Sequence, residues 1–417
     1  MCRANNHFIL VFILLMTLNL YAQKTESSSK IVQEIFLIGD TGYSPAKMKA
    51  KGLQALEAYI DKNDTRNAHL VFLGDNIYPK GMPPASDKLR FDAEIRIDHQ
   101  LDIARKFGGN ITFIPGNHDY YADGLPAVKR QEAYIDDHFD QKDEWLPEPG
   151  CAIDGKNIGD DVYLITVDSQ WFLTDWDKHP KINKDCHELQ TREEFFIEFG
   201  TEIKKNQNKT VIIALHHPLY SNGIHGGKFP LRKHIFPVSL PLPMPVIGTL
   251  GVFLRSLGGA SVQEVHNAKY QQMKERMSAI SKKWDHVIFA SGHEHTLQYI
   301  EDNGVKQIVS GSGSKSSYVT LGKNGKFASP EQGFARVKVF DNGTSTVDFF
   351  SLQYGELTKL ASEPIYEAFA GYDTSELPDS FDRTIQASIY DPSEEPDNSK
   401  FRESILGDHY RKLYYQP

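Results

Sequence analysis

Cysteine is scarce in this 417-residue chain, with three in all. Lysine and arginine form no block and the formal net charge is −9, so the sequence lacks the basic surface that nucleic-acid binding needs. After residue 22 no apolar run is long enough to cross a bilayer. We therefore expect no nucleic-acid partner and no transmembrane helix in the mature chain. The composition, 40% apolar and 24% charged, is that of an ordinary globular protein.

The N-terminus has the organisation of a signal peptide. Arg3 supplies a positive start, residues 8–20 are dominated by apolar side chains, and Ala22 offers a small residue for cleavage. The run is too short to span a bilayer comfortably, although an uncleaved anchor is the alternative. We expect residues 1–22 to be removed and the protein to be exported, to the periplasm, the cell surface or the medium.

Removal of residues 1–22 leaves two cysteines, Cys151 and Cys186. In an oxidising compartment they can pair, and the alternative is two free buried thiols. Because the loop between them is long, a disulfide would stabilise the fold by about 3–4 kcal/mol.

Short apolar runs, each followed by polar residues, recur along the chain and predict buried strands. They are residues 35–38, 70–73, 111–114, 163–167, 211–215 and 287–290. Helical spacing of apolar residues appears between them, over residues 47–59, 91–107, 191–205 and 263–283. Strands that alternate with helices predict a layered α/β fold.

The ends of these strands carry residue types that bind metal ions: Asp40, Asp75, Asn117, His216, His293 and His295. In an open α/β sheet, ligands bind beyond the carboxyl ends of the strands. A single Asp after a strand is usually a turn or cap residue. The repetition at five successive strand ends favours a metal site.

The series also resembles a known family. Five blocks, Asp40-Thr-Gly, Gly74-Asp-Asn-Ile-Tyr, Gly116-Asn-His-Asp, the strand-end His216 and Gly292-His-Glu-His, are similar to those of the calcineurin-like metallophosphoesterases. The resemblance covers roughly residues 35–313. It implies a four-layer α/β sandwich of two mixed sheets flanked by helices, with a dinuclear metal site at the sheet edge.

One departure narrows the resemblance. Many members have Asp-x-His in the first block, whereas this chain has Gly42, which offers no side-chain ligand. Tyr78, three residues after Asp75, would replace the missing histidine, although a packed aromatic is the alternative reading. The combination resembles the purple acid phosphatases, and residues 293–313 are similar to the tartrate-resistant branch of that group.

The resemblance assigns each ligand a role. Asp75 would bridge two metal ions, with the first site completed by Asp40, Tyr78 and His295 and the second by Asn117, His216 and His293. A phenolate with carboxylates suits Fe(III), and the second shell suits a divalent Fe, Zn or Mn. The two ions would clamp the phosphoryl group and generate a hydroxide nucleophile.

Several other histidines are candidates for the remaining chemistry. His118 is our candidate for the general acid that protonates the leaving group. His225, nine residues after His216, matches a histidine that contacts substrate in the tartrate-resistant enzymes, although a plain loop histidine is the alternative. His217 is a weaker candidate, His234 has no match, and Asp119 is expected to support the loop or a neighbouring histidine.

Two regions depart from the pattern. Residues 236–259 form an apolar insert rich in Pro and Gly, read either as a lid or contact surface or as a hydrophobic loop folded onto the sheet. Residues 361–417 turn acidic and read as a linker or tail. The predicted catalytic domain is therefore residues 31–358, and the insert or the tail offers a means of association with the cell envelope.

We expect a phosphoric monoester hydrolase of the acid phosphatase kind, acting on a phosphate-ester substrate. A phosphodiesterase or nucleotide hydrolase on the same centre is the first alternative, because the motifs do not determine which phosphate ester is bound. A non-catalytic binding module of the envelope is the alternative from another class.

Overall fold

We describe the protein from a computed structural model. It describes residues 29–44, 47–139, 143–175, 186, 189, 191–235, 244–256 and 261–367. The predicted signal peptide lies outside these residues. Within them, no helix is both long enough and apolar enough to cross a membrane.

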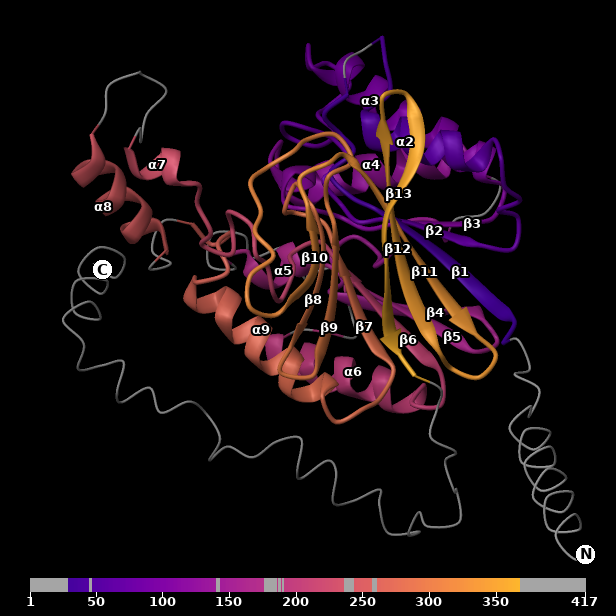
Figure 1. The fold of residues 1–417 in the computed structure, drawn as a ribbon. Coiled ribbons are helices and arrows are strands. Elements are labelled where there is room, and N and C mark those ends of the chain that lie inside the picture. Colours follow the sequence, from indigo (N-terminus) through magenta and orange to yellow (C-terminus); the bar gives the residue numbers. More distant parts are fainter. Residues whose placement is uncertain are drawn as a thin grey trace, which may run out of the picture. The chain divides into compact units, whose positions relative to one another are not determined.

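The first sheet has six strands in the order β13-β12-β11-β1-β2-β3 (Figure 1). Its parallel part comprises β1 (Ile31–Ile38), β2 (His69–Phe72) and β3 (Asn110–Phe113). Antiparallel strands extend it on the other side of β1: β11 (Gly333–Phe340), β12 (Ser345–Gln353) and β13 (Glu356–Tyr366). The sheet is therefore mixed.

The second sheet has seven strands in the order β10-β8-β9-β7-β6-β5-β4. β5 (Val162–Val167), β6 (Thr210–Leu215), β7 (Val287–Ser291) and β9 (Val305–Ser310) run parallel. The antiparallel members are β4 (Ile153–Gly159), β8 (Leu297–Asp302) and β10 (Gly325–Ser329). This sheet is mixed as well.

Alternate side chains along the central strands pack on opposite faces of each sheet. Ile35 and Leu37 of β1 join one apolar cluster with Ile212 and Ala214 of β6, which fills the space between the sheets. Phe36 belongs to the larger cluster that includes the helical side chains. Successive side chains of a strand point to opposite faces, so one strand serves both cores.

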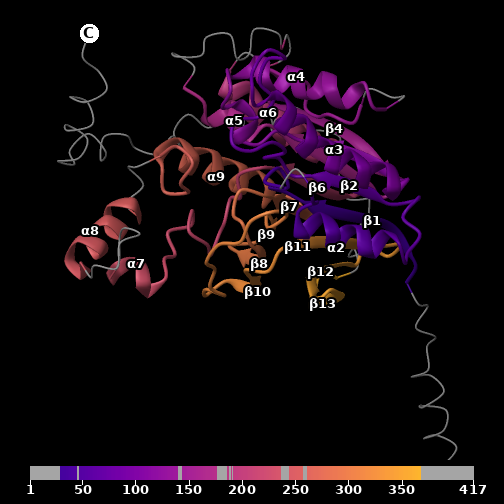
Figure 2. The ribbon, with the colours of Figure 1, turned by 90° about the horizontal axis from the view of Figure 1, so that it is seen from above.

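Helices cover the outer faces of the sheets (Figure 2). α2 (Lys51–Ile60) packs on β11 and β12 and against α3 (Arg90–Phe107). On the second sheet, α6 (Arg192–Lys205) packs against β4 and α9 (Ala268–Ser281), and α5 (Ser169–Leu173) also meets α9. The two helical layers and two mixed sheets confirm the predicted four-layer fold.

The remaining described elements are η1 (His118–Tyr120), α4 (Leu125–Asp136), α7 (Leu231–Ile235) and α8 (Pro245–Ser256). The boundaries of the predicted helices shift in two places. α2 begins at residue 51 rather than 47, and α9 begins at residue 268, where Asn267 caps it by accepting from the Lys269 amide. Residues 263–267 are left free of the helix, and two of them reach the site described below.

The structure bears on three further expectations, which concern the disulfide, the insert and the tail. Cys151 and Cys186 form a disulfide, with Cα atoms 5.0 Å apart. The reading of the insert as a loop folded onto the sheet is wrong for residues 245–256, which form α8 and expose large apolar side chains. β13 extends to Tyr366, past residue 361 at which we began the tail; residues 368–417 lie outside the described residues.

Candidate metal centre

The predicted ligands come together from both sheets. Asp40 follows β1, Asp75 follows β2 and Asn117 follows β3, which are neighbours in the first sheet. His216 follows β6 and His293 follows β7, which are neighbours in the second. Parallel strands end at the same edge, so their following loops converge there.

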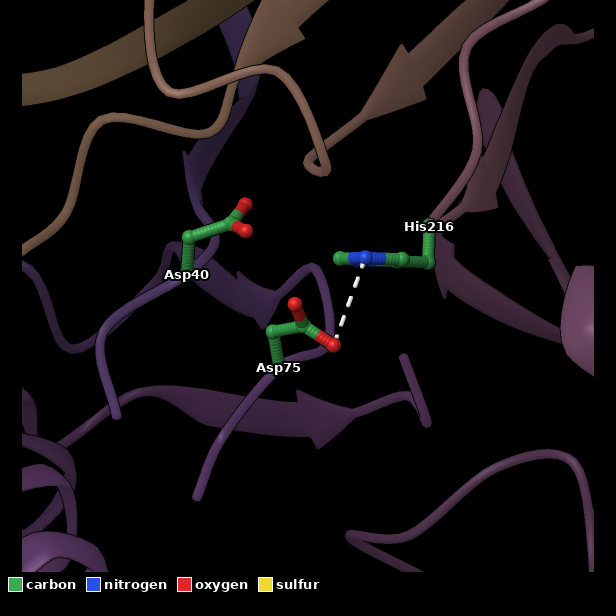
Figure 3. A group of neighbouring side chains, drawn as sticks. All are labelled: Asp40, Asp75 and His216. Atoms are coloured by element: carbon green, nitrogen blue, oxygen red, sulfur yellow. Dashed lines mark ion pairs between the residues drawn. The ribbon is translucent and has the colours of Figure 1, made fainter. Parts of the chain in front are cut away.

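Three side chains form the centre of this cluster, and Figure 3 shows them pointing toward one another. One ligand atom each from Asp40, Asp75 and His216 lie within 4.8 Å of one another, and all three residues are buried. An oxygen of Asp75 lies 3.4 Å from His216 Nε2. Two buried carboxylates side by side require a cation nearby.

Tyr78 points into the same group. Its hydroxyl lies 2.7 Å from Asp40 Oδ1 and 2.7 Å from Asp75 Oδ2, and 3.2 Å from His295 Nε2. A phenol has one proton and can donate to only one of these carboxylates at a time. A cation among the four side chains would satisfy the remaining oxygens.

Asn117 lies between two histidines. Its Oδ1 is 3.1 Å from His216 Nε2 and 3.1 Å from His293 Nδ1. His216 donates its other nitrogen, Nδ1, to the Leu73 carbonyl at 2.8 Å, and His293 donates Nε2 to the Gln263 carbonyl at 2.9 Å. When these rings are neutral, as metal ligation requires, they present lone pairs to the oxygen of Asn117, which also accepts.

The donor sets therefore fit two metal ions. Acceptor atoms that face one another at about 3 Å need positive charge between them, and backbone carbonyls that fix the outer nitrogen are typical of metal-bound histidines. Asp40, Asp75, Tyr78 and His295 would hold one ion. Asp75, Asn117, His216 and His293 would hold the other.

The acid–base properties of the site follow from its burial and its charges. Burial alone would raise the pKa of Asp75, but His216 and Tyr78 lower it overall. Burial would lower the pKa of His216, and the Asp75 and Asp40 carboxylates raise it to about 9. Burial and the same carboxylates raise the pKa of Tyr78 well above its usual value. A bound metal ion would reverse this by favouring the phenolate.

The backbone at three of these residues adopts the left-handed region. The φ angles of Asp40, Asp75 and His293 are 56°, 54° and 66°. Residues other than glycine rarely adopt such angles, and they cluster at functional sites, where surrounding structure enforces them. The unusual backbone angles of these three residues therefore support a functional site in which the side chains must point in fixed directions.

The model of one protein family, Calcineurin-like phosphoesterase, matches residues 34–311. The chain belongs to this family. The match spans every residue of the cluster and the strands β2 to β9, whereas β10 to β13 lie beyond it.

No curated protein matches the sequence. Among solved structures, the chain is similar to GAP50, the anchor in the inner membrane complex of Plasmodium, at 16% identity over 87% of this chain and 96% of that one, with a TM-score of 0.46. It is also similar to a purple acid phosphatase from yellow lupin (Lupinus luteus) seeds, at 13% identity over 82% of this chain, with a TM-score of 0.49. It spans 55% of the lupin chain.

His118 of this calcineurin-like phosphoesterase lies at the edge of the cluster. Its amide donates to Asp75 Oδ1 at 2.8 Å, and its Nδ1 donates to the Pro79 carbonyl at 2.7 Å. The ring packs against Tyr78, 4.3 Å between centroids, and against Tyr121. These contacts orient the ring and leave Nε2 for a reacting group.

His225 reaches the site beside His293. Its ring centroid is 4.2 Å from that of His293, and its Nδ1 lies 3.5 Å from the buried carboxylate of Glu264. Glu294 of the last motif accepts from Ser221 Oγ and from the Gly226 amide, so it holds the loop that carries His225.

Asp119, which we expected to support the site, and His217, a weaker candidate for the chemistry, both make structural contacts. Asp119 accepts from the amides of Gly116, Asn76 and Ile77, and so joins two ligand loops. His217 is buried between Ser169 Oγ and the Gln263 side chain, and burial together with His216 lowers its pKa to about 3. His234 lies on α7.

Three residues of the site were not predicted. Lys315 Nζ lies 3.2 Å from the centre of the Tyr78 ring, and Gln263 and Glu264 contact His293 and His225. Lys315 follows the Gly311-Ser-Gly-Ser segment, and Gln263 and Glu264 follow the apolar insert. In the sequence, the only indication that these three residues belong to the site was their proximity to the Gly-Ser segment and to the insert.

Proposed function

We propose that this calcineurin-like phosphoesterase is a metal-dependent phosphoric monoester hydrolase of the purple acid phosphatase type. The first ion would be Fe(III), and the second a divalent Fe, Zn or Mn. The observation that carries the proposal is the Tyr78 hydroxyl, 2.7 Å from the carboxylates of both Asp40 and Asp75. A phenolate with carboxylates is a hard donor set that favours a trivalent ion.

Bound at these residues, two metal ions would supply Lewis acidity and lower the pKa of a bound water. The side chains of the protein supply the remaining steps. His118, with Nδ1 donating to the Pro79 carbonyl, would hold a transferable proton on Nε2 for the leaving alkoxide. His225, steadied by Glu264, would contact the substrate beside His293.

Export is part of the same proposal. The signal-like N-terminus and the Cys151–Cys186 disulfide both suit an oxidising compartment outside the cytoplasm. Periplasm, cell surface and medium are all compatible with these two features.

The proposal is tested by comparing 4-nitrophenyl phosphate with bis(4-nitrophenyl) phosphate as substrates between pH 4 and pH 8. We expect the monoester to be hydrolysed faster, with its optimum below neutrality, and all activity to be lost in Asp75→Asn. Faster hydrolysis of the diester would favour the phosphodiesterase alternative. A metal-free protein with no turnover of either ester, or of ATP, would support the non-catalytic alternative.

A further inference from the structure

The segment between β6 and α9 contains the apolar insert and carries the helices α7 and α8, which pack on each other. Both ends of this segment make hydrogen bonds beside the metal centre. The Gly226 amide donates to Glu294 near one end, and the Gln263 carbonyl accepts from His293 near the other. In Figure 1 the two helices stand apart from the sheets, in pink on one side. Nothing in the proposed hydrolysis uses them.

α8 turns an apolar face away from α7. Gly248 is its contact point with α7, because a Cβ there would lie 2.2 Å from the His234 carbonyl oxygen. At 3.6 residues per turn, Val246, Leu250 and Phe253 fall on the side opposite Gly248. They are exposed by 79%, 54% and 55%, and the neighbouring Ile247 by 60%. On α7, Leu231 is 74% exposed.

The insert and the residues on either side of it are basic. From residue 216 to residue 263 the sequence has four Lys and Arg residues and no Asp or Glu, in a chain whose net charge is −9. Lys228, Arg232 and Lys233 are exposed at or beside α7. A basic, apolar helical pair on an otherwise acidic protein complements a negatively charged surface.

We propose that α7 and α8 dock on an anionic membrane surface, with Val246, Ile247 and Leu250 buried among the lipids and the basic residues at the headgroups. A lipid surface accommodates both features at once, because apolar side chains enter the acyl region while lysine and arginine remain at phosphate level. A second copy of the chain fits less well, since two basic helical pairs would repel each other. Docking holds the His225 side of the metal centre near the headgroups.

The experiment is co-sedimentation of the purified chain with vesicles, either of phosphatidylcholine alone or of phosphatidylcholine with an equal part of phosphatidylglycerol. All proteins start at Gln23, because the apolar run before it would bind lipid; every described element lies after that residue. The variants are Val246→Asp/Leu250→Asp and Arg232→Glu/Lys233→Glu. The matched control is Phe91→Asp/Ile197→Asp, which changes two apolar residues exposed on α3 and α6.

We expect the wild-type protein and the control to bind the anionic vesicles at least tenfold better than the neutral ones, and binding to weaken with added salt. Val246→Asp/Leu250→Asp is expected to reduce binding at least tenfold, and Arg232→Glu/Lys233→Glu to remove the preference for anionic lipid. Circular dichroism and metal content should match the wild type in all variants. The result is independent of the phosphatase proposal, because binding requires no turnover.

Two results would overturn the proposal. One is a wild-type protein that stays in the supernatant with anionic vesicles, or that binds no better than Val246→Asp/Leu250→Asp. The other is a wild-type protein that is dimeric in solution and does not bind vesicles, together with a Val246→Asp/Leu250→Asp variant that is monomeric. In that case the face would join two copies of the chain.

Discussion

A Cβ atom on Gly42 would lie 2.4 Å from the carbonyl carbon and oxygen of Asn76. Residue 42 is the position at which many family members have the histidine of Asp-x-His. In this chain the loop that carries Asp75 and Tyr78 occupies the space that a side chain at residue 42 would need. The Tyr78 amide donates a hydrogen bond to the Gly42 carbonyl. The loop that excludes a histidine thus delivers the tyrosine.

We predict that Gly42→His cannot restore the ligand lost in Tyr78→Phe. Even Gly42→Ala must displace the 74–79 loop, which would cost about 1–3 kcal/mol in the free energy of unfolding and lower the metal content. Urea unfolding and metal analysis measure both effects.

Gly200→Ala is the matched control for this change. A Cβ at Gly200, within α6, meets Ile280 at an ordinary 3.4 Å, so this variant should be as stable as the wild type or more so. Full metal content in Gly42→His/Tyr78→Phe would contradict the steric account.

Glu264 is predicted to position His225. Glu264→Gln should lower kcat/KM for a monoester about tenfold without loss of metal, because it removes the charge 3.5 Å from the His225 ring. The effect should vanish when His225 is already alanine, as expected for two residues that act together. Glu275→Gln, on the exposed side of α9, is the control. An equal effect of Glu264→Gln in the two backgrounds would remove the positioning role.

The Cys151–Cys186 disulfide closes a loop with a sequence separation of 35. Replacing both cysteines with alanine should lower the free energy of unfolding by about 3–4 kcal/mol, because the unfolded chain regains the freedom that the crosslink removes. A reducing agent should shift the unfolding midpoint of the wild type toward that of the variant, and leave the variant unchanged. Free thiols in the oxidised wild type would contradict the pairing.

Stability should also depend on the protonation of Glu132 in α4. Burial, with the charges of Asp136 and Glu148, raises the pKa of Glu132 to about 7. The folded state then binds a proton more tightly than the unfolded state, so its contribution to stability falls as pH rises from about 4.5 to about 7.

Glu132→Gln should therefore unfold at a higher temperature than the wild type at pH 8, and at the same temperature near pH 4.5. Because the side chain is only half-buried, solvent screening reduces the gain to about 1 kcal/mol. The control is Glu356→Gln, at the exposed start of β13. A constant difference between variant and wild type across this pH range would rule out the titration of Glu132.

The sequence was informative about the candidate metal ligands because they lie in the loops that follow buried strands. Buried strands have a recognisable apolar pattern, and the residue after the strand is fixed at the sheet edge. The four-layer fold was predictable from the family resemblance. β4 and the strands from β8 to β13 were not predicted, because their half-polar sequences pair only when the rest of the sheet is present.

The supporting contacts of the site could not be read from the sequence. Leu73 and Gln263 act through backbone carbonyls, which every residue has. Lys315 meets Tyr78 only because the loop after β9 folds back across the site. Such contacts depend on tertiary structure, and no local pattern encodes them.

We propose a dinuclear centre with Tyr78 as a ligand to a ferric ion. Its most direct test is the visible absorption spectrum, with metal analysis, of the chain from Gln23 onward beside Tyr78→Phe. We predict about two metal ions per chain and a broad visible band that disappears in the variant. A colourless wild-type protein that holds two metal ions, with a variant that is indistinguishable from it, would contradict the claim.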